Sequence, residues 1–277
     1  MRSRIALGLV WLLSFSCAPA QTKPAERAVS SQEATAVVQQ ALADQQRMTD
    51  LLEKYTYSKH IVSESFTMKD KPTGRYERVY SYAPCEGRQC ITLVSVENRP
   101  PKEKELKEHE KEMKKLREQE AKKTPADKQK EEDEDLFLSK DFLAVFDFSD
   151  GGSDLYKGTA VQVVAFRPKE EKVALANKDN KVLTKMAGRL WITEVDHQIV
   201  ASEMKMIKPI KVWGGFAGAI NAMTVQQEYV RDHGMYLPKK SVVEMEIRIM
   251  FSKGKLRLTE EYLELKAPAA PAVASGQ

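Results

Sequence analysis

Apolar and polar residues alternate with a period of two along much of this chain, and this alternation is the sequence feature that most restricts its fold. The pattern runs through residues 55–68, 75–84 and 91–96, and it resumes from Asp154 toward the C-terminus. Short segments such as 70–74, with Asp, Pro and Gly, separate the runs. Strands joined by short turns pair as antiparallel neighbours. The sequence therefore predicts roughly ten strands in one antiparallel sheet.

Residues 31–54 show the period of a helix instead. Apolar residues recur at Ala34, Val38, Ala41 and Met48, and Ser31 is a suitable N-terminal cap. A sheet of many strands curls and needs one of its faces covered. The predicted class is therefore α+β, with a single curved antiparallel β-sheet and an N-terminal helix.

Several predicted strands carry a uniform face. Tyr76, Arg78, Tyr80 and Tyr82 share one face of their strand. Other faces and one glycine-rich loop are apolar and rich in methionine, which packs well against irregular apolar ligands. We interpret these residues both as core under the helix and as the tentative lining of an acyl-chain cavity. They are Leu190, Ile192, Val200, Met204, Met206, Trp213, Phe216, Met245, Ile247, Ile249 and Phe251.

Residues 101–135 interrupt the strand pattern with a long run of Lys, Glu and Asp. Glu–Lys pairs at helical spacing in its first part predict a solvated, coiled-coil-like helical insertion. The following segment, 136–149, is the most apolar part of the chain after the leader, and its Phe and Leu spacing predicts a short amphipathic helix that closes one end of the core.

The first twenty residues have the order of a secretory signal peptide. Arg2 and Arg4 precede the apolar run 5–13, and Ala18 and Ala20 form an A-x-A site that predicts cleavage near Ala20. Export to the periplasm is therefore expected. Cys17 offers an alternative, lipid anchoring, although Ser14 stands where a lipoprotein signal has a branched aliphatic residue.

Cys85 and Cys90 flank a four-residue turn between two predicted strands. In an oxidising compartment, a disulfide across this turn is expected. The C-x4-C spacing does not match a C-x-x-C redox motif, and the segment has too few other ligands for a zinc site.

The sequence contains no motif of an enzyme or a cofactor-binding protein. G-x-S-x-G, H-E-x-x-H, the phosphate loop and the dinucleotide fingerprint are all absent. His197 and His233 each follow an Asp in a predicted turn, which is typical of surface positions. The net charge of +4 includes Arg2 and Arg4, so no binding to nucleic acid is indicated. We expect no catalysis, no cofactor and no metal, and an unrecognised hydrolase is the weakest alternative.

Three segments resemble the LolA/LolB/RseB-type superfamily of outer-membrane lipoprotein-sorting proteins. They read YKGTAVQVVAFRP, GRLWITEVDHQIVASEMK and VQQEYVRDHGMYLPKKS, between Gly158 and Val242. Glu194 or Asp196 stands where the family has an acidic turn residue, and Tyr236-Leu237-Pro238 where Trp-hydrophobic-Pro is common. The resemblance implies an open half-barrel with lid helices over its concave, apolar face. It also implies a lid-gating arginine in the first strands, for which Arg75 and Arg78 are candidates.

The resulting domain plan has a signal peptide at 1–20, a disordered leader at 21–30, one half-barrel domain at 31–266 with the insertion at 101–135, and a disordered tail at 267–277. The resemblance implies a periplasmic protein that binds acyl chains of lipids or lipoproteins, in lipoprotein sorting or lipid transport. The alternative is an envelope protein-interaction or stress-sensing module that docks a partner through the insertion.

Overall fold

The computed structural model describes residues 31–85, 88–122, 140–171, 173, 175, 178–212, 218–250 and 252–268. The predicted signal peptide, leader, second half of the insertion and most of the tail lie outside these residues. The elements, in chain order, are α1 (Ser31–Leu52), β1 (Thr56–Phe66), β2 (Pro72–Cys85), β3 (Arg88–Val96), α2 (Glu103–Lys122), α4 (Lys140–Val145), β4 (Phe146–Tyr156), β5 (Thr159–Pro168), the 3-10 helix η1 (Lys178–Lys185), β6 (Met186–Thr193), β7 (Ile199–Met206), β8 (Ile210–Val212), β9 (Gly218–Asp232), β10 (Met235–Ile249) and β11 (Ser252–Lys266).

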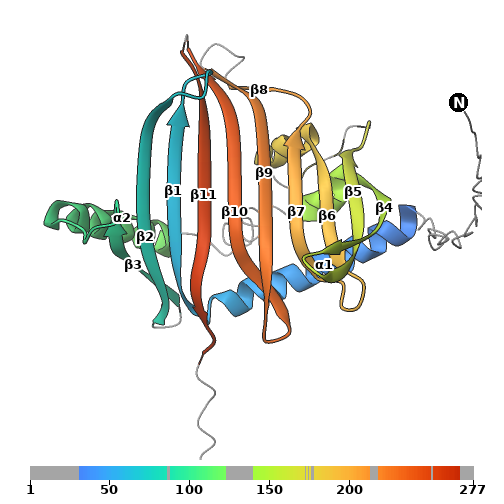
Figure 1. Cartoon of the computed structure of the whole chain (residues 1–277), viewed down its shortest axis with the longest axis horizontal. Helices are drawn as coiled ribbons and strands as arrows, with labels where there is room; N and C mark the ends of the chain where they lie inside the picture. Colours follow the sequence, from blue (N-terminus) through green and yellow to red (C-terminus); the bar gives the residue numbers. More distant parts are fainter. Residues whose placement is uncertain are drawn as a thin grey trace, which may run out of the picture.

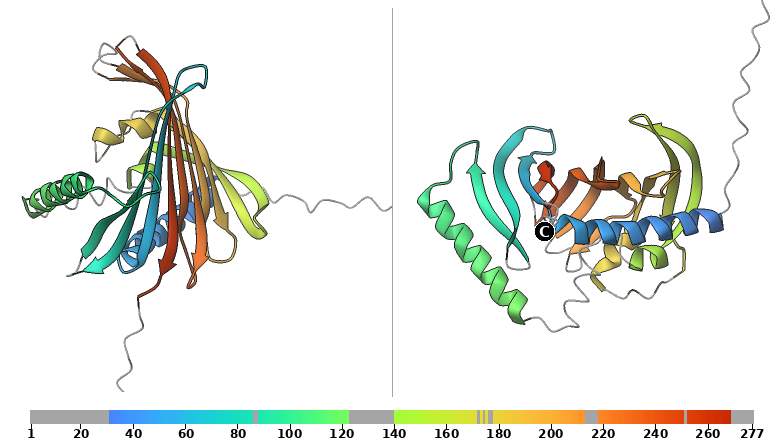
Figure 2. Two further views of the ribbon diagram at one scale, coloured as in Figure 1. Left: turned by 60° about the vertical axis from the view of Figure 1, so that its left-hand side comes forward. Right: turned by 90° about the horizontal axis from the view of Figure 1, so that it is seen from below.

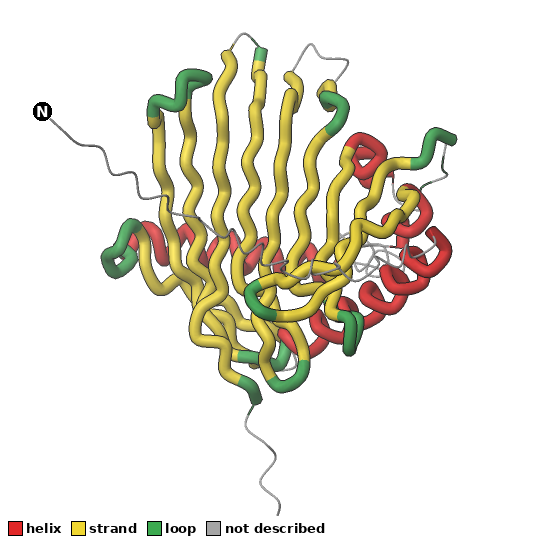
Figure 3. The backbone as a smooth tube through the Cα atoms, turned by 45° about the vertical axis from the view of Figure 1, so that its right-hand side comes forward, coloured by secondary structure: helices red, strands yellow, loops and turns green. Residues whose placement is uncertain are grey.

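All strands belong to one 11-stranded sheet in the order β3-β2-β1-β11-β10-β9-β7-β6-β5-β4, and the short β8 pairs with β9 (Figures 1 and 3). Every pairing is antiparallel, as predicted. The first strand pairs with the last, so β1 and β11 lie in the middle of one half of the sheet. The sheet is open, with β3 and β4 at its two ends. The predicted α+β class and open half-barrel are confirmed.

The sheet curves into an arch, and the described helices lie on its concave side (Figure 2). Helix α1 crosses the mouth of the arch and buries Ala34, Val38 and Ala41 against the sheet. The Ser31 hydroxyl at its N-terminus donates to the carbonyl of Phe148 on β4, at 2.9 Å. The apolar stripe of the predicted helix 31–54 thus meets the sheet that it was expected to cover.

The charged insertion is part of the connection between the two ends of the sheet. It follows β3 at one end, and the chain re-enters the sheet through α4 and β4 at the other. Its first part forms α2, in agreement with the predicted helix. Helix α2 stands away from the arch along most of its length (Figure 2).

The segment 136–149 differs from its prediction. Among its described residues, Lys140–Val145 is helical, and the chain enters strand β4 at Phe146. Phe142 of the helix and Phe146, Phe148 and Phe166 of the strands gather in one cluster, with ring centroids 4.7–5.8 Å apart. The aromatic residues fill the core as expected, but sheet pairing with β5 overrides the helical spacing.

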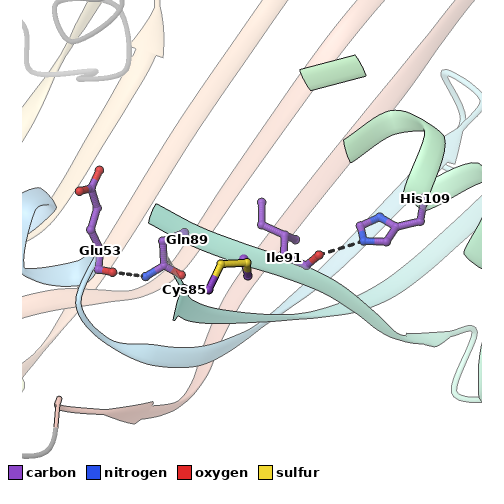
Figure 4. Close-up of a disulfide and its surroundings, with 6 residues drawn as sticks. Glu53, Cys85, Gln89, Ile91 and His109 are labelled. Carbon is purple, nitrogen blue, oxygen red and sulfur yellow. Dashed lines mark hydrogen bonds between the residues drawn. A yellow bond between two sulfur atoms is a disulfide. The ribbon is translucent and has the colours of Figure 1, made fainter. Parts of the chain in front are cut away.

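The predicted disulfide between Cys85 and Cys90 is present and closes the β2–β3 hairpin (Figure 4). Next to it, the Gln89 side chain lies at the C-terminal end of α1. Its amide nitrogen lies within hydrogen-bond distance of the carbonyls of Leu52, Glu53 and Tyr55. These carbonyls lie where a helix lacks internal donors, so the hairpin caps α1.

We predict that Gln89→Ala loosens the end of α1. Loss of the amide donor removes its part-buried hydrogen bonds to the Leu52 and Tyr55 carbonyls, which should lower the free energy of unfolding by about 1 kcal/mol. Hydrogen exchange of residues 51–55 should accelerate, while that of β6 and β7 stays unchanged. Gln39→Ala, at an exposed position of the same helix, is the control. Unchanged exchange at 51–55 would show that Gln89 does not hold the helix.

Candidate functional site on the concave face

The concave face has a covered half and an open half. Over β4 to β9, α1, α4 and η1 complete a dense core that includes Phe142, Met186, Leu190 and Met204. Along β10, cover decreases toward the β10–β11 turn. Leu237 is fully buried, Val243 is half-buried and Ile249 is 61% exposed. The fully buried core therefore ends partway along β10. Beyond that point, the concave face of the sheet is still apolar but only partly covered.

The open half contains a continuous set of half-buried apolar residues, which we call the apolar strip. Val243 pairs with Leu258, and Met245 pairs with Leu256 on β11 and with Met223 on β9. Because paired residues share a face, and because Val243 and Met223 pack against the core, the strip lies on the concave side. The apolar strip comprises Val243, Met245, Ile247, Leu256 and Leu258.

The predicted lining residues separate into groups. Leu190, Ile192 and Met204 are fully buried in the core, and Met206 packs against it. Met245 and Ile247 belong to the apolar strip, and Ile249 follows them on the same face of β10. Trp213, Phe216 and Phe251 lie outside the described residues.

Val200 and Met204 face opposite sides of β7, although strict alternation along the strand predicts one shared face. Ile192 pairs with Ile199, whereas Trp191 pairs with Ala201, so Val200 is the extra residue of a β-bulge. The bulge reverses the alternation, and Val200 packs with Val161 and Tyr236 in a separate cluster. Strict period-two counting cannot detect such an inserted residue.

Beside the apolar strip, β1, β2 and β11 carry a group of tyrosines and cations that we call the aromatic strip. Its members are Tyr57, Lys59, Tyr76, Arg78, Tyr80, Tyr82 and Tyr262. The β1–β2 register places Tyr57 opposite Tyr82, Lys59 opposite Tyr80 and Ile61 opposite Arg78. The predicted common face of the four β2 residues is thus confirmed, and it is the concave one because Lys59 also pairs with Tyr262.

Lys59 is held between aromatic rings and one carboxylate. Its Nζ lies 4.8 Å from the Tyr262 ring centroid, 5.5 Å from that of Tyr82 and 3.4 Å from the carboxylate of Glu260. Burial alone would lower the pKa of Lys59, but the Tyr262 and Glu260 oxygens outweigh it and raise the pKa above its ordinary value. Lys59 is therefore a fixed cation.

Arg78 has a different environment. Its guanidinium lies 4.6 Å from the Tyr76 ring centroid and donates to the Tyr80 hydroxyl at 3.1 Å. Its Nε is buried and has no hydrogen-bond partner among the described residues. Of the two predicted arginines, only Arg78 faces the concave side. Arg75 lies on the other face, in an ion pair with the buried Glu77, which also contacts His60 at 2.7 Å.

A groove of about 470 Å³ lies near the β1–β2 turn on the convex face. Phe66, Glu244, Lys255 and Arg257 contribute to its lining, and the strand alternation directs their side chains away from the core. Arg257 pairs with Glu244 and Lys255 pairs with Asp70. Polar and apolar residues line this groove in similar measure, and Met245 is the one predicted lining residue among them.

The histidines have structural positions. His109 lies within 3.1 Å of the Ile91 carbonyl, and His197 and His233 occupy left-handed turn conformations, as expected of turn residues. Within the described ranges, no three His, Cys, Asp or Glu side chains gather as a metal site would need. Likewise, no described helix has the length and apolar character needed to cross a bilayer.

Lys59 is not among the site residues that the sequence pattern predicted. Tyr57, Lys59 and Ile61 alternate visibly on one strand, but their importance comes from β2 and β11 on either side. Since β11 lies about 200 residues farther along the chain, no local pattern indicates that pairing.

No protein-family model matches the chain, and no curated protein matches its sequence. Solved structures that match include a DUF1329 family protein from Desulfovibrio piger, with 11% identity, 87% of this chain and 95% of that chain covered, and a TM-score of 0.30. A putative outer membrane lipoprotein-sorting protein domain from Vibrio parahaemolyticus has 8% identity, coverage of 85% and 95%, and a TM-score of 0.31. The MucA/MucB complex of Pseudomonas aeruginosa has 8% sequence identity, with 86% of this chain and 100% of that chain covered, and a TM-score of 0.23.

Proposed function

We propose that this chain is a non-enzymatic periplasmic protein that binds acyl chains of lipids or lipoproteins on the open half of its concave face. The apolar strip is the observation that carries the proposal. Its residues lie in register on β10 and β11, continue the core surface and remain half-buried. Large apolar residues in a concave surface are typical of binding sites for apolar ligands.

The energetics of burial support an acyl ligand. Each methylene group moved from water to an apolar surface contributes about 0.8 kcal/mol, so an acyl chain of ordinary length supplies several kcal/mol before ordering costs. Methionine at positions 223 and 245 accommodates chains of different shape. The export signal predicted at 1–20 and the Cys85–Cys90 disulfide support the periplasm as the compartment. A role in lipoprotein sorting or lipid transport is consistent with such a ligand.

We predict that Met245→Asp weakens binding of a fluorescent 16-carbon fatty acid by about tenfold or more, because a carboxylate in the strip repels the chain and must be desolvated. Secondary structure and melting temperature should change little, since Met245 is already partly exposed. Fluorescence titration and circular dichroism measure the two effects.

Val242→Asp is the matched control for this prediction, because Val242 is half-buried on the opposite face of the same strand. If Met245→Asp loses binding and secondary structure together, Met245 is a core residue only. If both variants bind like the wild type, the apolar strip is not the acyl site.

A second candidate function is protein interaction through α2, and the position of this helix favours it. Glu105 pairs with Arg99 at 2.7 Å, and His109 is buried against Ile91 and Tyr80. Beyond His109, most described side chains are exposed, and Leu116 is 53% exposed. The helix is thus anchored by its first half and presents its second half to solvent.

We predict that reversing the charge of Lys111, Lys114 and Lys115 to Glu abolishes cross-linking of this protein to an envelope partner and leaves its secondary structure unchanged. The three lysines are exposed, so the fold should tolerate the change. Lys266→Glu, at an exposed lysine on the last strand, is the control. Identical cross-linked products from wild type and variant would rule out this face of α2 as the docking surface.

A further inference from the structure

The concave face places two cations side by side at one end of the apolar strip. Lys59 is opposite Tyr80, and Arg78 is opposite Ile61, so the two occupy diagonal positions on paired strands. Tyrosine rings surround both of them. Positive charge is uncommon in a half-buried, aromatic setting unless it is paired.

Arg78 is incompletely paired. Among the described residues, no carboxylate lies within 4.0 Å of its guanidinium, and its buried Nε has no acceptor. The only hydrogen bond that it donates within this set goes to the Tyr80 hydroxyl. Glu112 on α2 is close enough to raise the pKa of Arg78 together with the tyrosines, but it is exposed and beyond ion-pair distance. A buried N–H without an acceptor is unfavourable, and an arriving acceptor would remove that cost.

The chemistry of the missing acceptor follows from the donor. A planar guanidinium binds carboxylate and phosphate groups through two parallel hydrogen bonds. Lys59 adds a second positive charge next to Arg78. Glu260 neutralises one of these two charges through its ion pair with Lys59. Tyr76 and Tyr80 supply hydroxyl groups at the same place; burial raises the pKa of Tyr76 to about 12, so its hydroxyl remains a donor at neutral pH.

The apolar strip begins next to this group of donors. From β2, the sheet continues through β1 and β11 to β10. Three strand spacings separate Arg78 from the apolar residues of β10, which is about 14 Å. On β11 the concave surface changes from polar to apolar between Glu260 and Leu258. Ser63 of β1 lies opposite Leu258. Polar and apolar surfaces thus follow one another within the length of an acyl chain.

We propose that the ligand of the concave face is an anionic amphiphile, whose phosphate or carboxylate headgroup binds Arg78 beside Lys59 and whose acyl chain lies on the apolar strip. This inference rests on the proposed acyl-binding function and names the class of lipid. Arg78 is then the residue that determines headgroup specificity. A lipid without a phosphate or carboxylate fills the apolar strip but leaves the Arg78 Nε without an acceptor.

Two lipids that share an acyl chain test the proposal: palmitoyl lysophosphatidic acid, which carries a phosphate, and monopalmitoylglycerol, which carries no anionic group, each below its micellar concentration. Isothermal titration of the full mature chain should give about tenfold or more tighter binding of the phosphatidic form, the range of a charged hydrogen bond. Arg78→Gln should remove this preference and leave the affinity for monopalmitoylglycerol unchanged. Glu112→Gln should raise affinity for the phosphatidic form, because it removes a nearby negative charge.

Arg257→Gln is the matched control, because Arg257 is on the opposite face of the neighbouring sheet region and pairs with Glu244. Arg78→Lys keeps the charge without the planar donor pair and should bind the phosphatidic form with intermediate affinity. Circular dichroism and melting temperature establish that each variant is folded. Inorganic phosphate, titrated alone, distinguishes a lipid headgroup site from a free-anion site and should bind at least about a hundredfold more weakly.

The outcomes separate the two proposals. If both lipids bind wild type and Arg78→Gln with one affinity, the headgroup inference is wrong and acyl binding stands. If neither lipid binds, the acyl-binding function fails and the headgroup inference fails with it. If inorganic phosphate binds as tightly as lysophosphatidic acid, the site is a free-anion site and the amphiphile proposal is overturned.

Discussion

The pairing of β1 with β11 is the interaction on which the rest of the structure depends. It joins the first strand of the chain to the last over their full length. As a result, the N-terminal meander β1–β3 extends the sheet formed by later strands, and β3 becomes one of its ends. The chain must then cross to the other end before β4 begins. The charged insertion lies in that crossing, which explains how a solvated helix can interrupt a sheet without disrupting its strand order.

The same pairing brings unlike surfaces together. Lys59 and the tyrosines of β2 come from the N-terminal meander, whereas Leu256, Leu258 and Met245 come from the C-terminal hairpin. The last residues of helix α1 pack with Tyr57, Tyr82 and Tyr262 of the aromatic strip, and the rest of the helix packs over β4 and the core. The apolar strip, toward the β10–β11 turn, keeps less cover. An amphiphilic surface in a concave sheet therefore results from strand order and from helix placement together.

Local sequence patterns predicted much of this fold because the patterns reflect burial. The helix at 31–54, the helix of the insertion, the hairpin disulfide and the common face of Tyr76 to Tyr82 follow from spacing alone. Predictions were wrong where a tertiary partner changed the period. Phe146 pairs in a strand rather than extending a helix, and Val200 is displaced by a bulge.

The sequence by itself determined the alternation that makes an antiparallel sheet, the apolar stripe that makes α1 its cover, and the cysteines that close the first hairpin. These features depend on residues near one another in the chain. Tertiary structure alone decided which apolar residues are core and which form the open strip, and it placed Arg78 and Lys59 at the end of that strip. The physical reason is that burial and charge pairing of a strand residue depend on its neighbours across the sheet, and those neighbours come from distant parts of the sequence.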